Sequence, residues 1–176
     1  MLPIRAALVT FAALGLIAAG PPVPVKPDPD KIELTKMAGR WYEVARIPNK
    51  LQRNCEGATS DWRRTGDGYA VVQTCHKDAP DGPKTEWKAK AQVANPGENT
   101  RFKMSFFGGL VNQEYWVIDH RPDEGWLLLT TPTGQHLWLM SQRPSLAPSA
   151  KANALARVRQ LGFNTGLLEF PKPARN

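Results

Sequence analysis

Residue types that could carry out catalysis or hold a metal are few and scattered in this chain. The three histidines, His76, His120 and His136, have none of the spacings that bind metals, and none joins a cysteine cluster. The sequence has neither a Gly-x-Ser-x-Gly nucleophile elbow nor a Gly-Lys-Ser/Thr phosphate-binding loop. Asp119 directly precedes His120, but no nucleophile is placed beside them. The sequence therefore predicts no catalytic centre, no metal site and no cofactor.

Two polar residues, Glu43 and Ser60, are expected on inward faces of strands. Glu43 shares a face with Trp41 and Ala45 if side chains alternate. A buried carboxylate needs a partner or a raised pKa, and buried charges are normally paired. We therefore favour a structural carboxylate. Two alternatives stay open: Glu43 fixes the polar head of a ligand, or it is the acid–base residue of an enzyme, with Ser60 as the second candidate.

Cys55 and Cys75 are the two cysteines of the chain, and their spacing is not that of a Cys-x-x-Cys redox site. Export to an oxidising compartment would favour a disulfide between them, and two free thiols are the alternative. Strand alternation puts the pair diagonal across two neighbouring strands, which is too far for a plain bridge. A bulge or curled strand ends would be needed to bring them together.

The N-terminus has the composition of a removable export signal. Residues 1–20 combine Arg5 with an apolar run over residues 6–19, which is shorter than a membrane-spanning helix, so an uncleaved anchor is the less favoured alternative. Cleavage is expected near Ala19 or Gly20. No cysteine follows to carry an acyl anchor, so we expect a periplasmic or secreted protein that is not lipid-anchored. A proline-rich spacer at 21–30, a single domain at 31–170 and a tail at 171–176 would follow.

Period-two alternation with short turns predicts an all-β domain. A late helix is expected from Pro148 to about Gly162, followed by a short final strand at 167–170. Eight strands with short links are the number found in a closed antiparallel up-and-down barrel that holds one small ligand. The expected strands cover residues 40–46, 56–63, 69–75, 85–93, 100–107, 113–119, 126–131 and 135–141.

The inward faces of these strands would line the barrel. Small Ala89 and Ala91 leave room where a filled core would carry larger side chains, although a fully packed interior is the alternative. A lining of this kind suits a small hydrophobic ligand. Together with Glu43, the predicted ligand-binding residues are Ala58, Ser60, Trp62, Val72, Ala89, Ala91, Phe102, Met104, Phe106, Tyr115, Val117, Trp138 and Met140.

The net charge of +7 is dispersed, without a polybasic tail, so the composition does not indicate nucleic-acid binding. Lys88, Lys90, Arg101 and Lys103 fall on the outward face of two neighbouring strands. This face is either a docking surface for anionic lipid head groups or, as we favour, a solvated surface that discourages aggregation. Charges there also argue against an integral membrane barrel. The oligomeric state, monomer or homodimer, is left open.

Four segments of the chain carry a resemblance to a known family. They are Gly39-x-Trp41-Tyr42-Glu43, Ser105-Phe106-Phe107-Gly108, Tyr115-x-Val117-Ile118, and Leu137-Trp138-Leu139-Met140-Ser141 followed by Pro144 and the helix. In this order and spacing they resemble the lipocalins, and the Trp-Tyr-Glu-Val form of the first resembles the bacterial lipocalin and apolipoprotein D branch. The resemblance covers about residues 31–170. It implies a carrier of fatty acids or lysophospholipids in membrane lipid transport, storage or repair, with an isomerase-like enzyme as the alternative.

The chain departs from this family at one structural position. Lipocalins usually place an arginine directly after the Trp-Leu-x-Ser segment, where it packs on the signature tryptophan, here Trp41. In this sequence Gln142 holds that position and Arg143 follows. Either a bulge brings Arg143 over Trp41, or Gln142 provides a neutral hydrogen bond in place of a cation–π contact.

Overall fold

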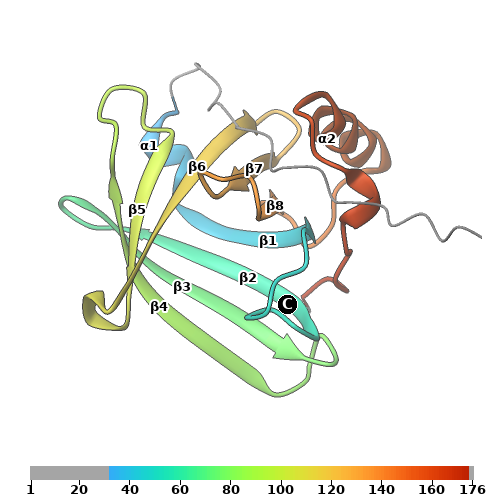
Figure 1. The fold of residues 1–176 in the computed structure, drawn as a ribbon, viewed down its shortest axis with the longest axis horizontal. Coiled ribbons are helices and arrows are strands. Elements are labelled where there is room, and N and C mark those ends of the chain that lie inside the picture. Colours follow the sequence, from blue (N-terminus) through green and yellow to red (C-terminus); the bar gives the residue numbers. More distant parts are fainter. Residues whose placement is uncertain (1–31, 175–176) are drawn as a thin grey trace, which may run out of the picture.

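A closed barrel of eight antiparallel strands forms the domain in a computed structural model that describes residues 32–174 (Figure 1). The expected export signal, the spacer at 21–30 and the last two residues of the tail lie outside the described residues. The elements are α1 (Leu34–Met37), β1 (Gly39–Arg46), β2 (Cys55–Arg64), β3 (Gly68–Lys77), β4 (Lys84–Val93), β5 (Arg101–Phe106), η1 (Phe107–Gly109), β6 (Val111–Arg121), β7 (Trp126–Thr130), β8 (Leu137–Ser141), α2 (Pro148–Gln160) and η2 (Thr165–Leu167).

Each strand pairs with its sequence neighbour, and β8 pairs with β1 to close the barrel, which confirms the predicted up-and-down topology. One end, the base, carries α1 and the β2–β3, β4–β5 and β6–β7 connections. The other end, the mouth, carries the β1–β2 loop (47–54), the β3–β4 loop (78–83), the β5–β6 turn (107–110) and the β7–β8 loop (131–136). Gly39 enters β1 with φ +107°, a backbone conformation that L side chains rarely adopt.

The base is filled by large side chains. Trp41 is 2% exposed, and its indole Nε1 donates to the carbonyl of Met37 in α1 at 3.0 Å. Above it, the rings of Trp62, Tyr69 and Phe102 meet edge to face, with centroids 5.4 to 6.0 Å apart. Such arrangements are the favourable ones for aromatic quadrupoles. This aromatic plug closes the lower half of the barrel.

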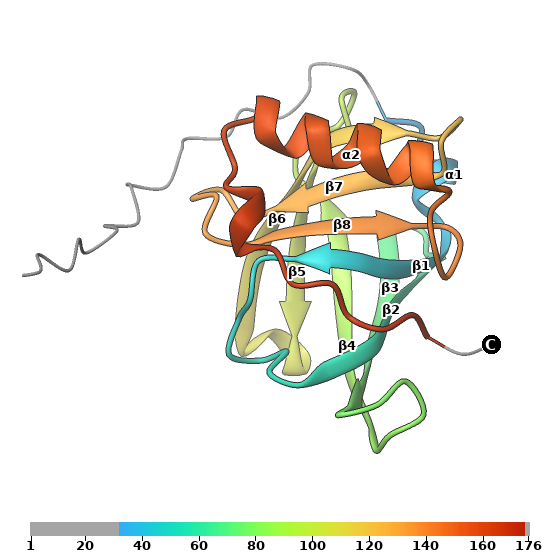
Figure 2. The same cartoon turned by 90° about the vertical axis from the view of Figure 1, so that its right-hand side faces the viewer.

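A second core lies outside the barrel, between its wall and α2. The helix runs across β7 and β8 (Figure 2) and buries Ala154 and Val158 against Leu128 and Leu139. Pro148 begins the helix and Gly162, at φ +88°, follows its end, as predicted. The predicted final strand at 167–170 is reduced to one β-bridge between Glu169 and Arg46 of β1.

Bulges change the face of side chains in two strands. In β1 the register shifts between Glu43 and Ala45, so Ala45 belongs to the outer core under α2 while Arg46 turns to the same side as Glu43. The expectation that Ala45 shares the inward face with Glu43 was therefore wrong. In β6 a shift between Val117 and Asp119 likewise sends Asp119 outward, where its carboxylate accepts from Arg157 of α2 at 2.5 Å.

Candidate functional site

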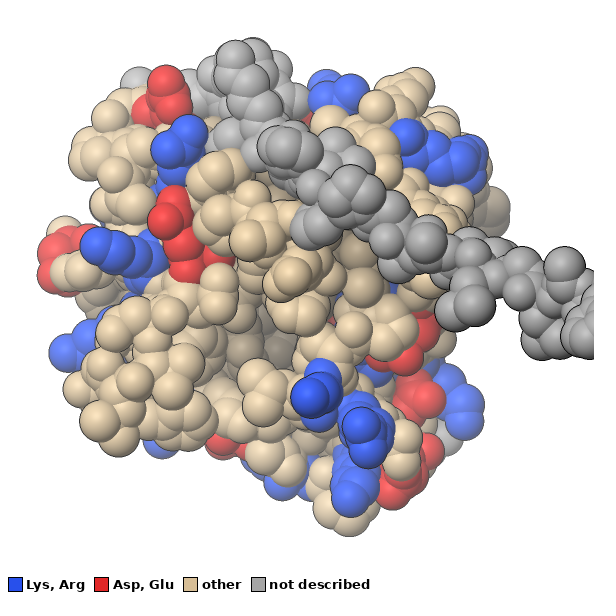
Figure 3. Space-filling model, viewed as in Figure 1, with Lys and Arg blue, Asp and Glu red and all other residues tan. Residues whose placement is uncertain are grey.

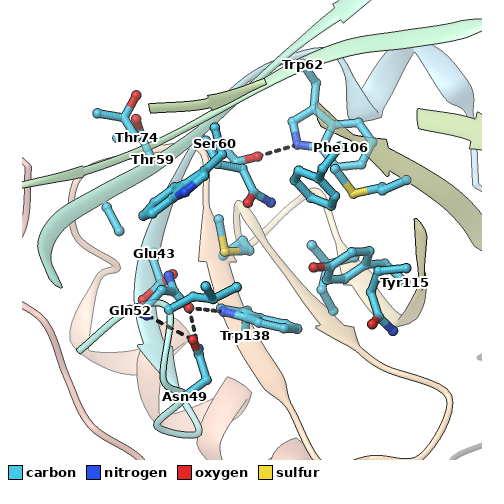
Figure 4. A pocket seen from close by; sticks show the side chains of 18 of the residues that line it. Glu43, Asn49, Gln52, Thr59, Ser60, Trp62, Thr74, Phe106, Tyr115 and Trp138 are labelled. Atoms are coloured by element: carbon cyan, nitrogen blue, oxygen red, sulfur yellow. Dashed lines mark hydrogen bonds between the residues drawn. The ribbon is translucent and has the colours of Figure 1, made fainter. Parts of the chain in front are cut away.

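A cavity of about 190 Å³ lies inside the barrel between the aromatic plug and the mouth (Figure 4). It continues outward into a wider basin of about 660 Å³ at the mouth, and both hollows share Asn49, Leu51, Gln113, Tyr115 and Trp138 as lining residues. The inner cavity alone is smaller than the roughly 300–1,000 Å³ typical of ligand pockets. A molecule held there would therefore extend into the basin.

Most of the predicted lining residues surround this cavity. Trp62 forms the cavity side of the plug, and its Nε1 donates to Ser60 Oγ at 2.8 Å. Strand alternation placed most of these residues correctly because the stretches of β5 and β8 that carry them pair without a register shift. The residues that were predicted and do line it are Glu43, Ala58, Ser60, Trp62, Met104, Phe106, Tyr115, Trp138 and Met140.

Four other predicted residues, Ala89, Ala91, Phe102 and Val117, face inward but lie in the packed core rather than at the cavity. They are between 0 and 7% exposed, and Phe102 belongs to the plug itself. The alanines therefore make room for neighbouring rings, not for a ligand. Alternation identifies a face, but it does not tell at what height along the barrel the packing ends.

Val72 was placed on the wrong face. In the structure Val72 pairs with Asp61, whereas its neighbours Val71 and Gln73 pair with the inward-facing Trp62 and Ser60. Val71 is 1% exposed and Gln73 lines the cavity. Because two valines adjoin in the sequence, either could have been taken as the inward one, and the alternation was read one residue out of phase.

The loops at the mouth supply much of the lining that sequence patterns missed. Loops lack a two-residue period, so no alternation marked these side chains, and polar residues on inward faces gave no apolar signal either. The lining residues that were not in the predicted set are Asn49, Leu51, Gln52, Thr59, Gln73, Thr74, Trp87, Phe107, Val111, Gln113 and Leu129.

One wall of the cavity carries a hydrogen-bonded network that ties the β1–β2 loop to the barrel (Figure 4). Gln52 donates from Nε2 to Glu43 Oε2 at 2.6 Å. Its Oε1 accepts from Asn49 Nδ2 at 2.6 Å and from Trp138 Nε1 at 2.8 Å. All four polar groups are thereby satisfied, so the loop is held across the mouth in one arrangement.

Arg46 completes this network from behind Glu43. Its buried guanidinium pairs with the carboxylates of Glu43 and Glu169 and donates to the carbonyls of Gln52 and Cys55 at 3.1 and 2.9 Å. Burial raises the pKa of the Glu43 carboxyl, and the nearby Arg46 cation opposes that shift. Glu43 is therefore a bonded, structurally engaged carboxyl, as we favoured from the sequence.

The charge distribution along the hollow is uneven. Among the described residues that line the inner cavity, Glu43 is the one with an acidic or basic side chain, and no lysine or arginine reaches it. Burial also raises the pKa of the Tyr115 phenol to about 12, so that hydroxyl stays neutral. The basin, by contrast, includes Lys50, Arg53 and Glu169, and the Glu169 carboxylate is paired with Arg46. Lysine and arginine side chains therefore lie along the basin and not along the inner cavity.

The predicted disulfide is present. Cys55 and Cys75 are bonded, with Cα atoms 5.4 Å apart. A bulge between Glu56 and Thr59 of β2 brings them together, which resolves the diagonal register expected from simple alternation. Both cysteines are buried and pack with Ala58 and Trp87, so the bridge fastens the β2–β3 wall at the mouth end.

The base differs from the expectation for the signature arginine. Arg143 is exposed, as is Gln142, and the Trp41 ring instead meets His120 edge to face with centroids 6.2 Å apart. Burial lowers the pKa of His120, which favours the neutral imidazole. His120 thus takes the place beside Trp41 that the sequence had left to Arg143 or Gln142. The bulge in β6 accounts for this, because it turns His120 toward Trp41.

Neither a metal-binding cluster nor a membrane-spanning helix is found in the described part of the chain. Residues 32–174 contain no cluster of three or more His, Cys, Asp or Glu side chains that could hold a metal. None of the helices within the same residues is both long and apolar enough to span a bilayer. His76 contacts the carbonyl of Gly82 through Nδ1 at 3.0 Å, which ties the β3–β4 loop to its strand.

Several known proteins are similar to this chain. Outer membrane lipoprotein Blc of Vibrio cholerae is 29% identical over 86% of this chain and 88% of its own length. The Escherichia coli K12 protein of the same name is 26% identical over 93% and 92%. Mouse apolipoprotein D is 25% identical over 80% and 79%. These relatives belong to the branch that the Trp-Tyr-Glu-Val segment resembles.

Solved structures share the fold at lower identity. Insecticyanin of the tobacco hornworm Manduca sexta superposes with a TM-score of 0.67 at 18% identity, covering 86% of each chain. Lobster apocrustacyanin A1 superposes with a TM-score of 0.63 at 14% identity, covering 86% of this chain and 91% of its own. The lipocalin-like domain family matches residues 32–173, and the chain belongs to this family.

Proposed function

We propose that this protein binds a single-chain amphiphile of the fatty acid or lysophospholipid class, with its tail in the cavity and its head in the basin. Membership of the lipocalin family supports a small hydrophobic ligand in general. The observation that carries the finer proposal is the split in charge: the inner cavity has no cation, whereas Lys50 and Arg53 line the basin. A carboxylate or phosphate would therefore stay at the mouth.

The lining supplies a driving force for the tail. Met104, Phe106, Leu129 and Met140 present apolar atoms to the cavity. Each methylene removed from water contributes about 0.8 kcal/mol before the loss of ligand freedom. The small volume of the inner cavity, about 190 Å³, favours one chain over two. We infer a role in the transport, storage or repair of membrane lipid.

Filling the cavity tests this proposal directly. Gln73→Trp introduces a large ring into the cavity from β3, and it should weaken binding of a fluorescent fatty acid by more than about tenfold, because the ring occupies the tail's space. Val72→Trp is the matched control, since the adjacent side chain pairs with Asp61 on the outward face. Equal affinities for Gln73→Trp, Val72→Trp and the parent protein would contradict an internal site.

The enzymatic alternative rests on Glu43. Its carboxylate is bonded to Arg46 and Gln52, and these contacts support a structural role over that of a free base. Within the described residues, the nearby Ser60 hydroxyl accepts from Trp62 and has no histidine bonded to it. Turnover of a bound lipid that disappears in Glu43→Gln, with binding retained, would favour the enzyme.

The expected location is the cell envelope, consistent with relatives named outer membrane lipoproteins. We propose a periplasmic or secreted protein that differs from these relatives, which are named lipoproteins, in not being lipid-anchored, since both cysteines of the given sequence are in the disulfide. The intact mass of the mature protein tests this: it should begin after Ala19 or Gly20 and carry no acyl mass. An added diacylglyceryl mass would contradict it.

Peripheral contact with an anionic membrane is a further part of the proposal. Lys88, Lys90 and Lys103 project outward from β4 and β5, while Arg101 lies over the Trp116 ring at 4.7 Å. These charges alone would give a weak, salt-sensitive attraction. Equal sedimentation with neutral and anionic vesicles at low salt would contradict a role for this side face.

A further inference from the structure

Large apolar side chains are exposed around the mouth. Leu51 on the β1–β2 loop is 81% exposed, and Leu110 on the β5–β6 turn is 86% exposed. Beside Leu110, Phe107 is 59% and Val111 49% exposed. We call these four residues the mouth rim. Leu51, Phe107 and Val111 also line the cavity, so the two loops border the same opening.

The backbone of the β5–β6 turn holds this rim outward. Phe107 has φ +51°, which is unusual for a bulky side chain, and Gly108 and Gly109 continue with φ +69° and +104°. Phe106, one residue earlier, points into the cavity. The reversal at Phe107 therefore gives the turn one buried aromatic ring, Phe106, and one ring at the edge of the opening that is more than half exposed, Phe107. Apolar residues held at the surface in this way usually mark a contact site.

Positive charge accompanies the rim. Lys50 and Arg53 flank Leu51 on the same loop, and both are exposed. Of the acidic residues at this end of the barrel, Glu169 lines the basin but is paired with Arg46, and Asp78 and Asp81 belong to a different loop, between β3 and β4. Figure 3 shows the surface over the β5–β6 turn, at the lower left, as a largely uncharged area beside a hollow. Apolar tips next to cations are typical of surfaces that enter the head-group region of a bilayer.

We propose that the protein docks mouth-down on a bilayer containing anionic lipid, with the mouth rim among the acyl chains and Lys50 and Arg53 at the head groups. A second copy of the chain fits the same surface less well. In a two-fold dimer the patch would face itself, so the cations of both copies would approach one another. The side face of β4 and β5 has the lysines but no exposed apolar rim, so it would not give binding that resists salt.

Docking in this orientation would join the bilayer interior to the cavity. Three rim residues belong to both surfaces, so an acyl chain could pass from the membrane to the cavity along apolar atoms. This consequence rests on the proposed function. The docking itself does not, because it depends on the outside of the mouth and needs no bound ligand.

Co-sedimentation with phosphatidylcholine vesicles, with and without phosphatidylglycerol, tests the proposal on the full chain after export. Leu110→Asp removes an exposed rim side chain that does not line the cavity, and it should lower partitioning onto anionic vesicles by about tenfold, at high salt as well as low. Leu167→Asp makes the same change in charge and apolarity on η2, and Lys88→Gln with Lys90→Gln removes charge from the side face. At high salt, where charges on the side face are screened, both controls should stay within about twofold of the parent protein.

Several results would overturn the docking mode. One is unchanged partitioning of Leu110→Asp onto anionic vesicles, and another is an equal loss of partitioning in the Leu167→Asp control. A third is a concentration-dependent dimer that forms through the rim in a protein that does not bind vesicles. Circular dichroism of each variant establishes that it is folded. Fatty-acid affinity without vesicles separates the two proposals: Leu110→Asp should retain it. A parent protein that docks but binds no fatty acid would contradict the proposed function and leave docking intact.

Discussion

The base and the mouth of this barrel are formed by the same eight strands, yet their interiors differ. At the base, Trp62, Tyr69 and Phe102 fill the cross-section and α1 covers the end. Toward the mouth, side chains such as Met104 and Tyr115 border empty space, and a polar network holds a loop over it. Packing thus stabilises one half of the barrel so that the other half can stay hollow.

The largest expected contrast concerns two phenylalanines of β5. Phe102→Ala should lower the free energy of unfolding by about 3–5 kcal/mol, because it opens a void in the plug. Phe106→Ala should cost less than about 3 kcal/mol, because its ring already borders a cavity. Urea unfolding measures both. A larger loss for Phe106→Ala would break the distinction between a packed base and a hollow mouth.

The disulfide is expected to contribute slightly less to the free energy of unfolding than the Phe102 ring does, and its contribution lies at the mouth. A bridge across 20 residues contributes about 3 kcal/mol when its effect on the unfolded chain dominates. The double variant Cys55→Ala and Cys75→Ala should lower stability by about that amount. Hydrogen exchange should quicken first near Ala58, while the amides around Phe102 remain protected. Uniform exchange along β2 and β5 would contradict a division between the two halves.

The carboxyl of Glu43 gives the mouth a pH dependence. Because its pKa is raised above the ordinary 4.5, the folded state binds more protons than the unfolded state between pH 4.5 and the raised pKa. Stability should therefore fall as pH rises through that window, by at most about 1.4 kcal/mol per pH unit from this group. Glu43→Gln should remove this slope in denaturant titrations. A slope that persists unchanged would assign the dependence to another group.

The smallest effect is expected at Arg143, one of the two residues that the sequence left open as the partner of Trp41. Arg143 is exposed, so Arg143→Ala should change stability by less than about 0.5 kcal/mol. Trp41→Ala, at the same end of the barrel, should cost about 3–5 kcal/mol. Thermal unfolding of both variants is the measurement. A large loss of stability in Arg143→Ala would instead indicate that Arg143 packs on the Trp41 ring.

Sequence patterns were sufficient for the strands, the helix and the closed barrel. Regular alternation in β5, with Phe102, Met104 and Phe106 on one face, left little ambiguity. Patterns failed where a bulge changed the register, as at Ala45, and where two valines adjoined at Val72. A bulge is decided by pairing across strands, which a single strand's sequence does not contain.

The extent of the cavity along the barrel could not be predicted from the sequence either. Inward apolar residues look alike whether they pack in a plug or border a void, so Phe102 and Met104 could not be told apart. The loop residues Asn49 and Gln52 have no periodic signal, and their role appears only when the chain closes over Glu43. Three-dimensional packing, not residue type, determines which inward positions are free.

A crystal structure with a fatty acid brominated at its tail end tests the central claim most directly. We expect the anomalous bromine peak inside the barrel, beside Trp62 and Met104 and above the Phe102 ring, with the carboxylate in the basin toward Lys50 and Arg53. A bromine peak below the plug, or a lipid bound only on the outer surface, would contradict the account of a hollow mouth above a filled base.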